Sequence, residues 1–419
     1  MKWLRVPTHT GYDLMLLSVV LGLIGIGLAM VYSASGIKAL DALDDPRYYL
    51  IQQSVWAGIG LAAMLVVARI DYHRYKHLAL PGLAIAVVLL GIVLVPGIGT
   101  RVGGASRWLR VSSFAGLQPA ELAKLALVIY LAFWLSAKRE RIGQWSVTVP
   151  VVACITLVAG LVIAEPDLGT AIVLVATGLA MYFVAGARIA EFAALAGLTT
   201  ICVAALAVAQ PYRLARLVTF LDPWSDPQKS GFQTIQSIYG LALGGPLGEG
   251  LGAGREKFGF LPAPYTDSIF AVLGDELGLL GTLTVVVLFL VIAFKGIRIA
   301  LAAPDATGAL LATGVTVWIV FQAWVNMAVV AALVPMTGIT LPFISYGGSS
   351  ICVGLVAVGI LLNVGRQAVA SADRTSVQGP ARRRGDRRAR QPAARGRGGT
   401  RSSDDRRASV HRWTSRPRG

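Results

Sequence analysis

The stretch from Asp13 to Tyr32 decides the fold of this chain and reads DLMLLSVVLGLIGIGLAMVY, with its only charge at the start. About 20 consecutive apolar residues are enough for a helix to cross a bilayer. No convincing small-residue cleavage site follows before the next apolar run, so we expect this helix to remain in the mature protein. An uncleaved signal-anchor has the same appearance, and the residues leave that alternative open.

Composition predicts the same fold class for most of the chain. Of 419 residues, 55% are hydrophobic and only 14% are charged, which is more apolar surface than a soluble domain can bury. The 47 glycines suit a membrane bundle, because small residues let helices approach closely. We therefore predict an all-α polytopic membrane protein.

Ten apolar segments are expected to be transmembrane helices. They lie at residues 13–32, 50–68, 78–95, 119–136, 147–164, 168–185, 189–209, 268–294, 308–333 and 343–364. Short loops with Lys and Arg occur at alternate connections, and such loops are typically cytoplasmic, so both termini are predicted to be cytoplasmic. The one long loop, about 210–267 between helices 7 and 8, is then extracytoplasmic, and a loop of that length is usually functional.

The charge distribution divides the chain into a transmembrane domain, predicted at 1–366, and a basic, disordered cytoplasmic tail at 367–419. Residues 371–419 hold 15 Arg and 4 Asp, and so contribute +11 of the formal charge of +16. Such a tail has too little apolar content to fold alone. It is expected to bind anionic membrane lipids or an acidic partner, or to stay solvated and fix the topology, and no nucleic acid is expected.

Metal and disulfide chemistry have little support in the sequence. Cys154, Cys202 and Cys352 fall in apolar segments at spacings that suit neither a metal site nor a disulfide framework, so we expect packing residues. The four histidines lie outside the predicted spans and form no ligand pattern.

The strongest functional candidate closes the long loop. Residues 261–270 read LPAPYTDSIF and place Asp267 at the water-facing mouth of an apolar helix. Charge is costly at a membrane boundary, so an acid there favours a functional explanation. The competing interpretation, that Thr266 or Asp267 only caps the following helix, fits the residues equally well.

Other polar residues lie inside or beside the predicted spans. Glu121 and Lys124 are i,i+3 neighbours that can neutralise each other; such a pair joins helices or lines a polar cavity, and its place near the outer helix end favours the cavity. Asp167 is expected to be a helix N-cap. Gln322 and Asn326 are expected to hydrogen-bond neighbouring helices.

Two further stretches are candidates for contacts with anions. Residues 103–109, GGASRWL, are expected at the membrane interface, where Arg107 contacts an anion such as a lipid phosphate or simply extends to the headgroups. Residues 341–350, LPFISYGGSS, open the last span. Backbone N–H groups there, with Ser345 and Ser349, can hold an anion, or the small residues only pack helices.

Taken together, these motifs resemble the SEDS family of shape, elongation, division and sporulation proteins over nearly all of residues 10–366. The PWSDP and SGFQ segments are more similar to the FtsW than to the RodA members. The segments that carry the resemblance are, in order, GGASRWL, QPAELAKLA, EPDLGTA, RLARLVTFLDPWSDP, GFQTIQS, FLPAPYTDSIFAVLGDELGLLG and LPFISYGGSS.

The resemblance implies a peptidoglycan glycosyltransferase that polymerises lipid II into glycan strands at the outer face of the bacterial cytoplasmic membrane. It implies a class B penicillin-binding protein, a transpeptidase, as partner, together with other division or elongation proteins, and favours cell division at the septum. A flippase of the lipid-linked precursor and a scaffold of the division machinery are the alternatives.

The resemblance also implies roles for individual residues. The family's essential Asp maps onto Asp267, which would act as general base for the acceptor hydroxyl. The family's polar cavity maps onto Glu121, Lys124, Arg213, Arg216 and Gln236. The cations among these would bind the lipid diphosphate in an inverting, single-displacement reaction. A divalent cation, Mg²⁺ or Mn²⁺, is a candidate to share that task, although no ligand cluster marks its site, and no organic cofactor is expected.

Three positions depart from the family pattern. Tyr265 stands where His is frequent, Ser268 where Phe is usual, and Glu165 in place of a common Gln. The acid itself is retained, so these departures concern the geometry of the site rather than its chemistry.

Overall fold

The structure is a computed structural model that describes residues 13–102, 105–110, 116–258, 261–262 and 264–388. It is mainly helical, with one small sheet. The elements are, in order, α1 (Leu14–Leu43), α2 (Tyr48–Arg69), η2 (Tyr72–Tyr75), α3 (Lys76–Val93), β1 (Gly99–Val102), β2 (Ala105–Arg110), β3 (Gly116–Leu117), α4 (Pro119–Ala137), η3 (Arg139–Arg141), α5 (Trp145–Ala164), α6 (Leu168–Val184), α7 (Ile189–Ala209), α8 (Pro211–Leu221), η4 (Pro223–Ser225), α9 (Phe232–Leu243), α10 (Ile269–Ala302), α11 (Ala306–Val330) and α12 (Gly348–Arg388).

The predicted set of membrane helices is confirmed. Within the described ranges, nine helices are long and apolar enough to cross a membrane, and the shorter apolar helix α6 coincides with the remaining predicted span. The first helix was predicted too short, because α1 continues to Leu43 and still buries Ser35 and Ala39 beyond the predicted end.

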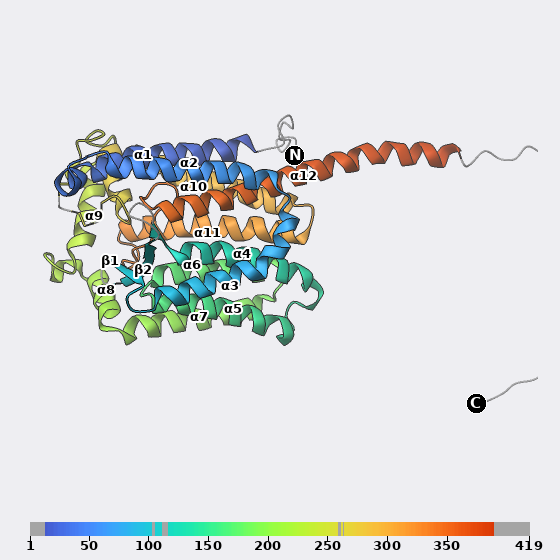
Figure 1. Cartoon of the computed structure of the whole chain (residues 1–419), viewed down its shortest axis with the longest axis horizontal. Coiled ribbons are helices and arrows are strands. Elements are labelled where there is room, and N and C mark those ends of the chain that lie inside the picture. Colours follow the sequence, from blue (N-terminus) through green and yellow to red (C-terminus); the bar gives the residue numbers. More distant parts are fainter. Residues whose placement is uncertain (1–12, 103–104, 111–115, 259–260, 263, 389–419) are drawn as a thin grey trace, which may run out of the picture. The chain divides into compact units, whose positions relative to one another are not determined.

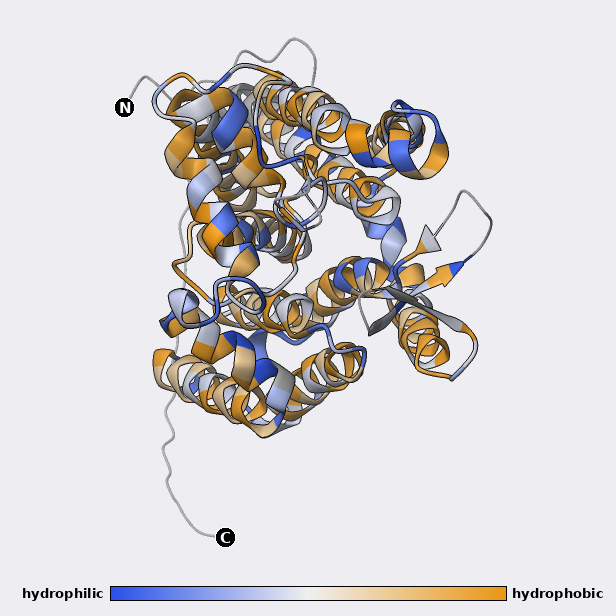
Figure 2. Cartoon of the chain, turned by 90° about the vertical axis from the view of Figure 1, so that its left-hand side faces the viewer, coloured by the Kyte–Doolittle hydropathy of each residue, from blue (hydrophilic) through white to orange (hydrophobic). Residues whose placement is uncertain are grey.

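Helix α11 lies at the centre of the bundle, where it packs against α4, α6 and α10. Helix α7 is peripheral, with no buried side chain among its residues. Helices α8 and α9 and the three strands gather at one end of the bundle, which we call the loop end (Figure 1). Figure 2 views the bundle from this end, with apolar residues along most of the helical ribbons.

A three-stranded antiparallel sheet, which the sequence did not predict, lies between α3 and α4. Strand β2 pairs with β1, with Gly99 opposite Leu109, and with β3, with Leu109 opposite Leu117. Pairing satisfies backbone N–H and C=O groups that a connection at a membrane surface would otherwise leave exposed. Most of the predicted interfacial stretch forms β2, whereas Gly103 and Gly104 lie outside the described residues.

Helix α10 is interrupted at Gly278, whose φ of 64° and ψ of −160° break the helical path. The glycine-rich segment 244–250 fills the break. Leu279 N donates to Gly245 O at 2.8 Å, and Glu249 N donates to Asp275 O at 3.0 Å. A Cβ at Gly278 would lie 2.3 Å from Gly248 N, so the glycines serve close approach of two backbones. Backbone groups freed by the break are thereby satisfied.

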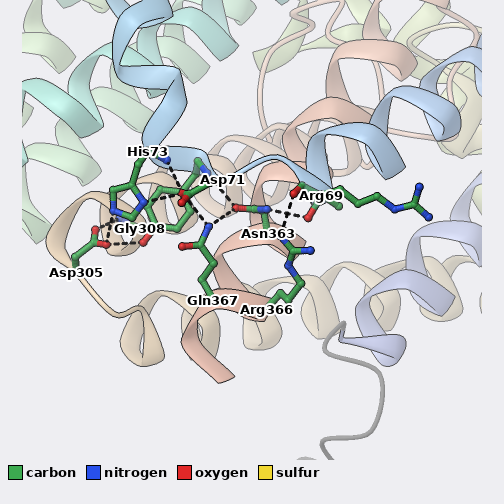
Figure 3. Close-up of polar contacts among 10 residues, drawn as sticks. Arg69, Asp71, His73, Asp305, Gly308, Asn363, Arg366 and Gln367 are labelled. Atoms are coloured by element: carbon green, nitrogen blue, oxygen red, sulfur yellow. Dashed lines mark hydrogen bonds and ion pairs between the residues drawn. The ribbon is translucent and has the colours of Figure 1, made fainter. Parts of the chain in front are cut away.

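A polar network closes the opposite end of the bundle (Figure 3). The His73 ring lies between two carboxylates, with Nδ1 2.7 Å from Asp71 and Nε2 3.0 Å from Asp305, the N-cap of α11. Asn363 of α12 donates to Ala68 O at 2.8 Å. The network therefore joins α12 to the α2–α3 turn and to the start of α11.

The described chain divides into two units, Met1–Ala372 and Asp373–Gly419. The elements from α1 to α11 belong to the first unit, whereas α12 continues past the boundary into the second. The predicted boundary between residues 366 and 367 falls within α12, and residues 389–419 of the predicted tail lie outside the described residues.

Candidate active site

Asp267 lies in the non-helical segment directly before α10, among the loops of the loop end. The N-cap of α10 is Ser268, and no side chain makes a capping hydrogen bond there. The interpretation of Asp267 as a helix cap is therefore wrong. The carboxyl instead accepts a hydrogen bond from the Thr266 hydroxyl at 3.1 Å.

The surroundings of the Asp267 carboxyl act on its pKa in two directions. Burial raises the pKa, whereas hydrogen bonds from Thr266 and Gln233 and the charge of Arg216 lower it. Burial prevails, so the pKa of Asp267 is raised above its ordinary value. A carboxylate with a raised pKa is a better general base. Of the side chains that lower the pKa, Arg216 lies on α8 and Gln233 on α9, where its Nε2 donates to Ser268 Oγ at 3.0 Å, next to Asp267.

A pocket of about 290 Å³ lies beside these residues, and Arg216 and Gln233 belong to its wall. The wall also carries a second cation, Lys229, and the hydroxyls of Thr219 and Ser230. Two cations with hydroxyl donors are suited to an anion such as a diphosphate. Lys229 was missed by sequence reasoning, and its signal was a lysine within the PWSDPQKSGFQ stretch of the functional loop.

The two predicted arginines of α8 have different surroundings. Arg216 donates to Met336 O at 3.0 Å and lines the pocket. Arg213 reaches away from it and donates to Ile163 O at 3.2 Å and Leu206 O at 3.4 Å, carbonyls near the ends of α5 and α7. The structure thus brings only Arg216 to Asp267.

Glu121 and Lys124 form a buried ion pair at 2.8 Å. Lys124 also donates to Gln322 Oε1 at 2.6 Å and lies over the Trp318 ring at 5.0 Å, so the pair ties α4 to α11. Neither residue lines the pocket beside Asp267. The geometry matches the helix-joining alternative, and a direct role in substrate binding stays a prediction.

The two serines of the last predicted motif hold backbone segments together. Ser345 donates to Thr266 O at 2.6 Å and accepts from Leu341 N at 2.7 Å, so it braces the residue before Asp267. Ser349 donates to Gly116 O at 2.8 Å, which joins α12 to β3. Their predicted contact with an anion stays a prediction.

Gln236 is half-buried on α9, one turn after Gln233. It is not part of the wall of the pocket, whereas Gln233 is. Its predicted role in substrate binding is therefore untested by this geometry.

Gln322 and Asn326 were expected to hydrogen-bond neighbouring helices. Gln322 does so, because its Oε1 accepts from Lys124 of α4 at 2.6 Å. The amide nitrogens of both residues donate to main-chain carbonyls of loops. Gln322 donates to Thr340 O at 3.0 Å, and Asn326 donates to Asp267 O at 2.8 Å. The sequence carried no signal for the second contact, because 59 residues separate its partners.

Arg107 and Glu165 meet at the end of α5. Arg107 donates through Nε to Glu165 O at 3.2 Å and through Nη2 to Pro166 O, so this cation caps carbonyls. Burial raises the pKa of Glu165 to about 8, the Asp167 charge adds to the rise, and Arg107 opposes it. Asp167 accepts from Thr170 N at 3.1 Å, which confirms its predicted role as N-cap of α6.

Apolar helices of membrane-spanning length, with a half-buried acid and a pocket that carries two cations among their connecting loops, define an integral membrane protein. The chain belongs to the family of cell cycle proteins FtsW, RodA and SpoVE, whose model matches residues 14–369. The family expected from the motifs is thereby confirmed.

Curated relatives cover nearly the whole family region. Stage V sporulation protein E of Bacillus subtilis is 44% identical over 358 residues, which are 85% of this chain and 98% of the relative. "Probable peptidoglycan glycosyltransferase FtsW" of Trichlorobacter lovleyi is 42% identical over 354 residues, which are 84% of this chain and 93% of the relative.

Two solved structures are similar in fold. A chain from the structure described as "Structural coordination of polymerization and crosslinking by a peptidoglycan synthase complex" has a TM-score of 0.69 and 30% identity, covering 86% of this chain and 99% of that one. The rod shape determining protein RodA of Thermus thermophilus has a TM-score of 0.63 and 26% identity, with the same coverage.

Proposed function

We propose that this protein is a peptidoglycan glycosyltransferase that polymerises lipid II into glycan strands at the outer face of the cytoplasmic membrane. The observation that carries the proposal is the Asp267 carboxyl beside Arg216 and Gln233, which line a pocket with a second cation, Lys229. Relatives named as peptidoglycan glycosyltransferases, 42% identical over 84% of this chain, support the reaction.

The chemistry requires that a sugar hydroxyl loses its proton, that its oxygen attacks an anomeric carbon, and that a lipid diphosphate leaves. Asp267 takes the proton, a task suited to its raised pKa. Arg216 and Lys229 bind the diphosphate and stabilise the charge that grows as the bond breaks. An α-linked donor that yields a β-linked chain implies inversion, hence one displacement without a covalent enzyme intermediate.

A divalent cation, Mg²⁺ or Mn²⁺, remains a prediction. The side chains that lower the pKa of the Asp267 carboxyl are Thr266, Gln233 and Arg216. In the part of the chain that the structure describes, no three His, Cys, Asp or Glu side chains come together as a ligand group. These side chains alone do not fit a protein-held metal centre, so proton transfer and charge stabilisation are assigned to Asp267, Arg216 and Lys229.

The proposal includes partners and a location. The likeness to a chain from a peptidoglycan synthase complex supports an assembly with a crosslinking enzyme, which we take to be a class B penicillin-binding protein. Lys and Arg in the short loops favour cytoplasmic termini and an outer position for Asp267. We further propose action at the division septum, with other division proteins and with membrane lipids around the basic tail.

The test is to purify the protein with its transpeptidase partner and to supply fluorescent lipid II. The wild type should form glycan polymer, and Asp267→Asn should lose roughly 10²–10⁴-fold in rate. Polymer formation at the wild-type rate by Asp267→Asn would overturn the assignment of the base. Movement of lipid II across vesicle membranes without polymer formation would instead support a flippase. Recruitment of the partner with neither activity would support a scaffold.

A further inference from the structure

Asn326 occupies a buried position on α11, with its side chain 1% exposed. Its Nδ2 donates to Asp267 O at 2.8 Å and to Ile339 O at 2.7 Å. Both acceptors are carbonyl oxygens, so only the amide nitrogen can face them, and this fixes the orientation of the side chain. One side chain thus joins the segment before α10 to the segment between α11 and α12.

Three consecutive carbonyls at residues 265–267 are held by donors from the last third of the chain. The donors are, in order, Tyr346 N at 2.9 Å, Ser345 Oγ at 2.6 Å and Asn326 Nδ2 at 2.8 Å. The first two donors belong to a non-helical segment, whereas Asn326 belongs to the central helix of the bundle. A donor on a rigid helix holds its acceptor more accurately than a donor on a loop.

The carboxyl of Asp267 has partners of a different kind. It interacts with the neighbouring Thr266 hydroxyl, with Gln233 and with Arg216, all of which lie outside the membrane-spanning helices. The hydrogen bond from Asn326 is accepted by the main-chain carbonyl of Asp267, and it ties this residue to α11. A displacement of about 1 Å at a reacting group can cost about 10²-fold in rate.

We propose that Asn326 is a positioning residue, which anchors the main chain of Asp267 to α11 and thereby aims the carboxylate at the acceptor hydroxyl. The inference rests on the proposed function, because it gives Asp267 the role of base. Asn326 lies on a helix long and apolar enough to cross a membrane, and its side chain is not part of the pocket wall. Its contact with Asp267 is to the main-chain carbonyl and not to the carboxyl.

The test replaces Asn326 with Leu, which has a similar volume and no donor. With purified complex and fluorescent lipid II, kcat should fall roughly 10- to 100-fold while KM stays near the wild-type value, because substrate contacts are retained. Hydrogen exchange at the backbone amides of residues 265–268 should become faster. Asn326→Ser keeps a shorter hydroxyl donor and should give intermediate values of kcat and of the hydrogen-exchange rate. It replaces the Leu variant in the test if that variant does not fold.

Asn363→Leu is the matched control. Asn363 is also buried in a helix and also donates to a carbonyl of another segment, Ala68 O at 2.8 Å. It lies in the polar network with Asp305, the N-cap of α11, whereas Asn326 lies near the other end of that helix (Figure 3). Asn363 also accepts from Tyr72 N at 3.2 Å, so its loss should lower the melting temperature at least as much as the loss of Asn326. It should leave kcat and the exchange at residues 265–268 unchanged.

The pH profile separates positioning from a general loss of stability. The wild-type rate should rise with pH as Asp267 ionises, at a pH above the ordinary Asp value. In Asn326→Leu the freed segment admits water, so the rise should move to lower pH, whereas Asn363→Leu should keep the wild-type profile. A normal kcat and profile in folded Asn326→Leu would overturn the inference, and an active Asp267→Asn would overturn the proposed base itself.

Discussion

Lys257 Nζ lies 2.9 Å from Glu276 Oε1, and both side chains are almost completely buried. Ser33 of α1 completes the contact, because its hydroxyl donates to Glu276 Oε1 at 2.6 Å. Glu276 precedes the break of α10 at Gly278 by two residues. The ion pair therefore fastens α1 and the end of the long loop to the interrupted helix that follows Asp267.

Lys257→Met should destabilise the protein by roughly 3–5 kcal/mol, because it leaves the Glu276 carboxylate buried without its cation. Thermal unfolding in detergent measures the effect. Arg255→Met is the matched control, since its pair with Glu249 spans 3.8 Å and Arg255 is largely exposed. Equal melting temperatures for the two variants would contradict the structural role of the buried pair.

Gly278→Ala should destabilise the junction between α10 and the glycine-rich segment. The residue has a φ of 64°, and the new methyl group would lie 2.3 Å from Gly248 N. Such strain costs on the order of 1–3 kcal/mol and should lower the melting temperature. Gly160→Ala on α5, where a methyl group meets nothing within 4 Å, should be neutral or stabilising. A neutral Gly278→Ala would argue against the break.

Glu165→Gln should stabilise the protein increasingly as pH rises. The pKa of Glu165 is raised from 4.5 to about 8 on folding, so its contribution to stability is complete below the unfolded value and is lost as pH rises through the folded value. A pKa difference of one corresponds to about 1.4 kcal/mol. The melting temperatures of variant and wild type should agree near pH 5 and diverge towards pH 8. A constant difference across that range would show that Glu165 does not titrate as described.

Lys229→Met should weaken binding of the lipid diphosphate donor. A hydrogen bond to a charged group contributes about 1.5–3 kcal/mol, so we expect KM to rise roughly 10- to 100-fold. Steady-state polymerisation at varied lipid II concentration measures this. Lys76→Met, which removes an exposed lysine outside the pocket wall, is the control. An unchanged KM would remove Lys229 from the binding site.

Much of the fold could be predicted from local sequence. Long apolar runs become membrane helices because water is absent from the bilayer core and each helix satisfies its own backbone. The Glu121–Lys124 pair could be predicted for a similar reason, since residues three apart share a helix face. Asp267 could be singled out because a charge at the mouth of an apolar helix is costly.

The tertiary structure decided the contacts that no local rule describes. Arg213 and Arg216 are three residues apart on α8, and only the packing of the loop end places Arg216, not Arg213, beside Asp267. The break at Gly278 depends on a partner backbone about thirty residues earlier, so no periodicity reveals it.

The sequence by itself therefore determined the membrane helices, their order and the acid at the site, because hydropathy and helix geometry act over a few residues. Only the tertiary structure determined how that acid is held. Asn326 and Asp267 are 59 residues apart, and their hydrogen bond exists because α11 packs at the centre of the bundle, within reach of the segment before α10.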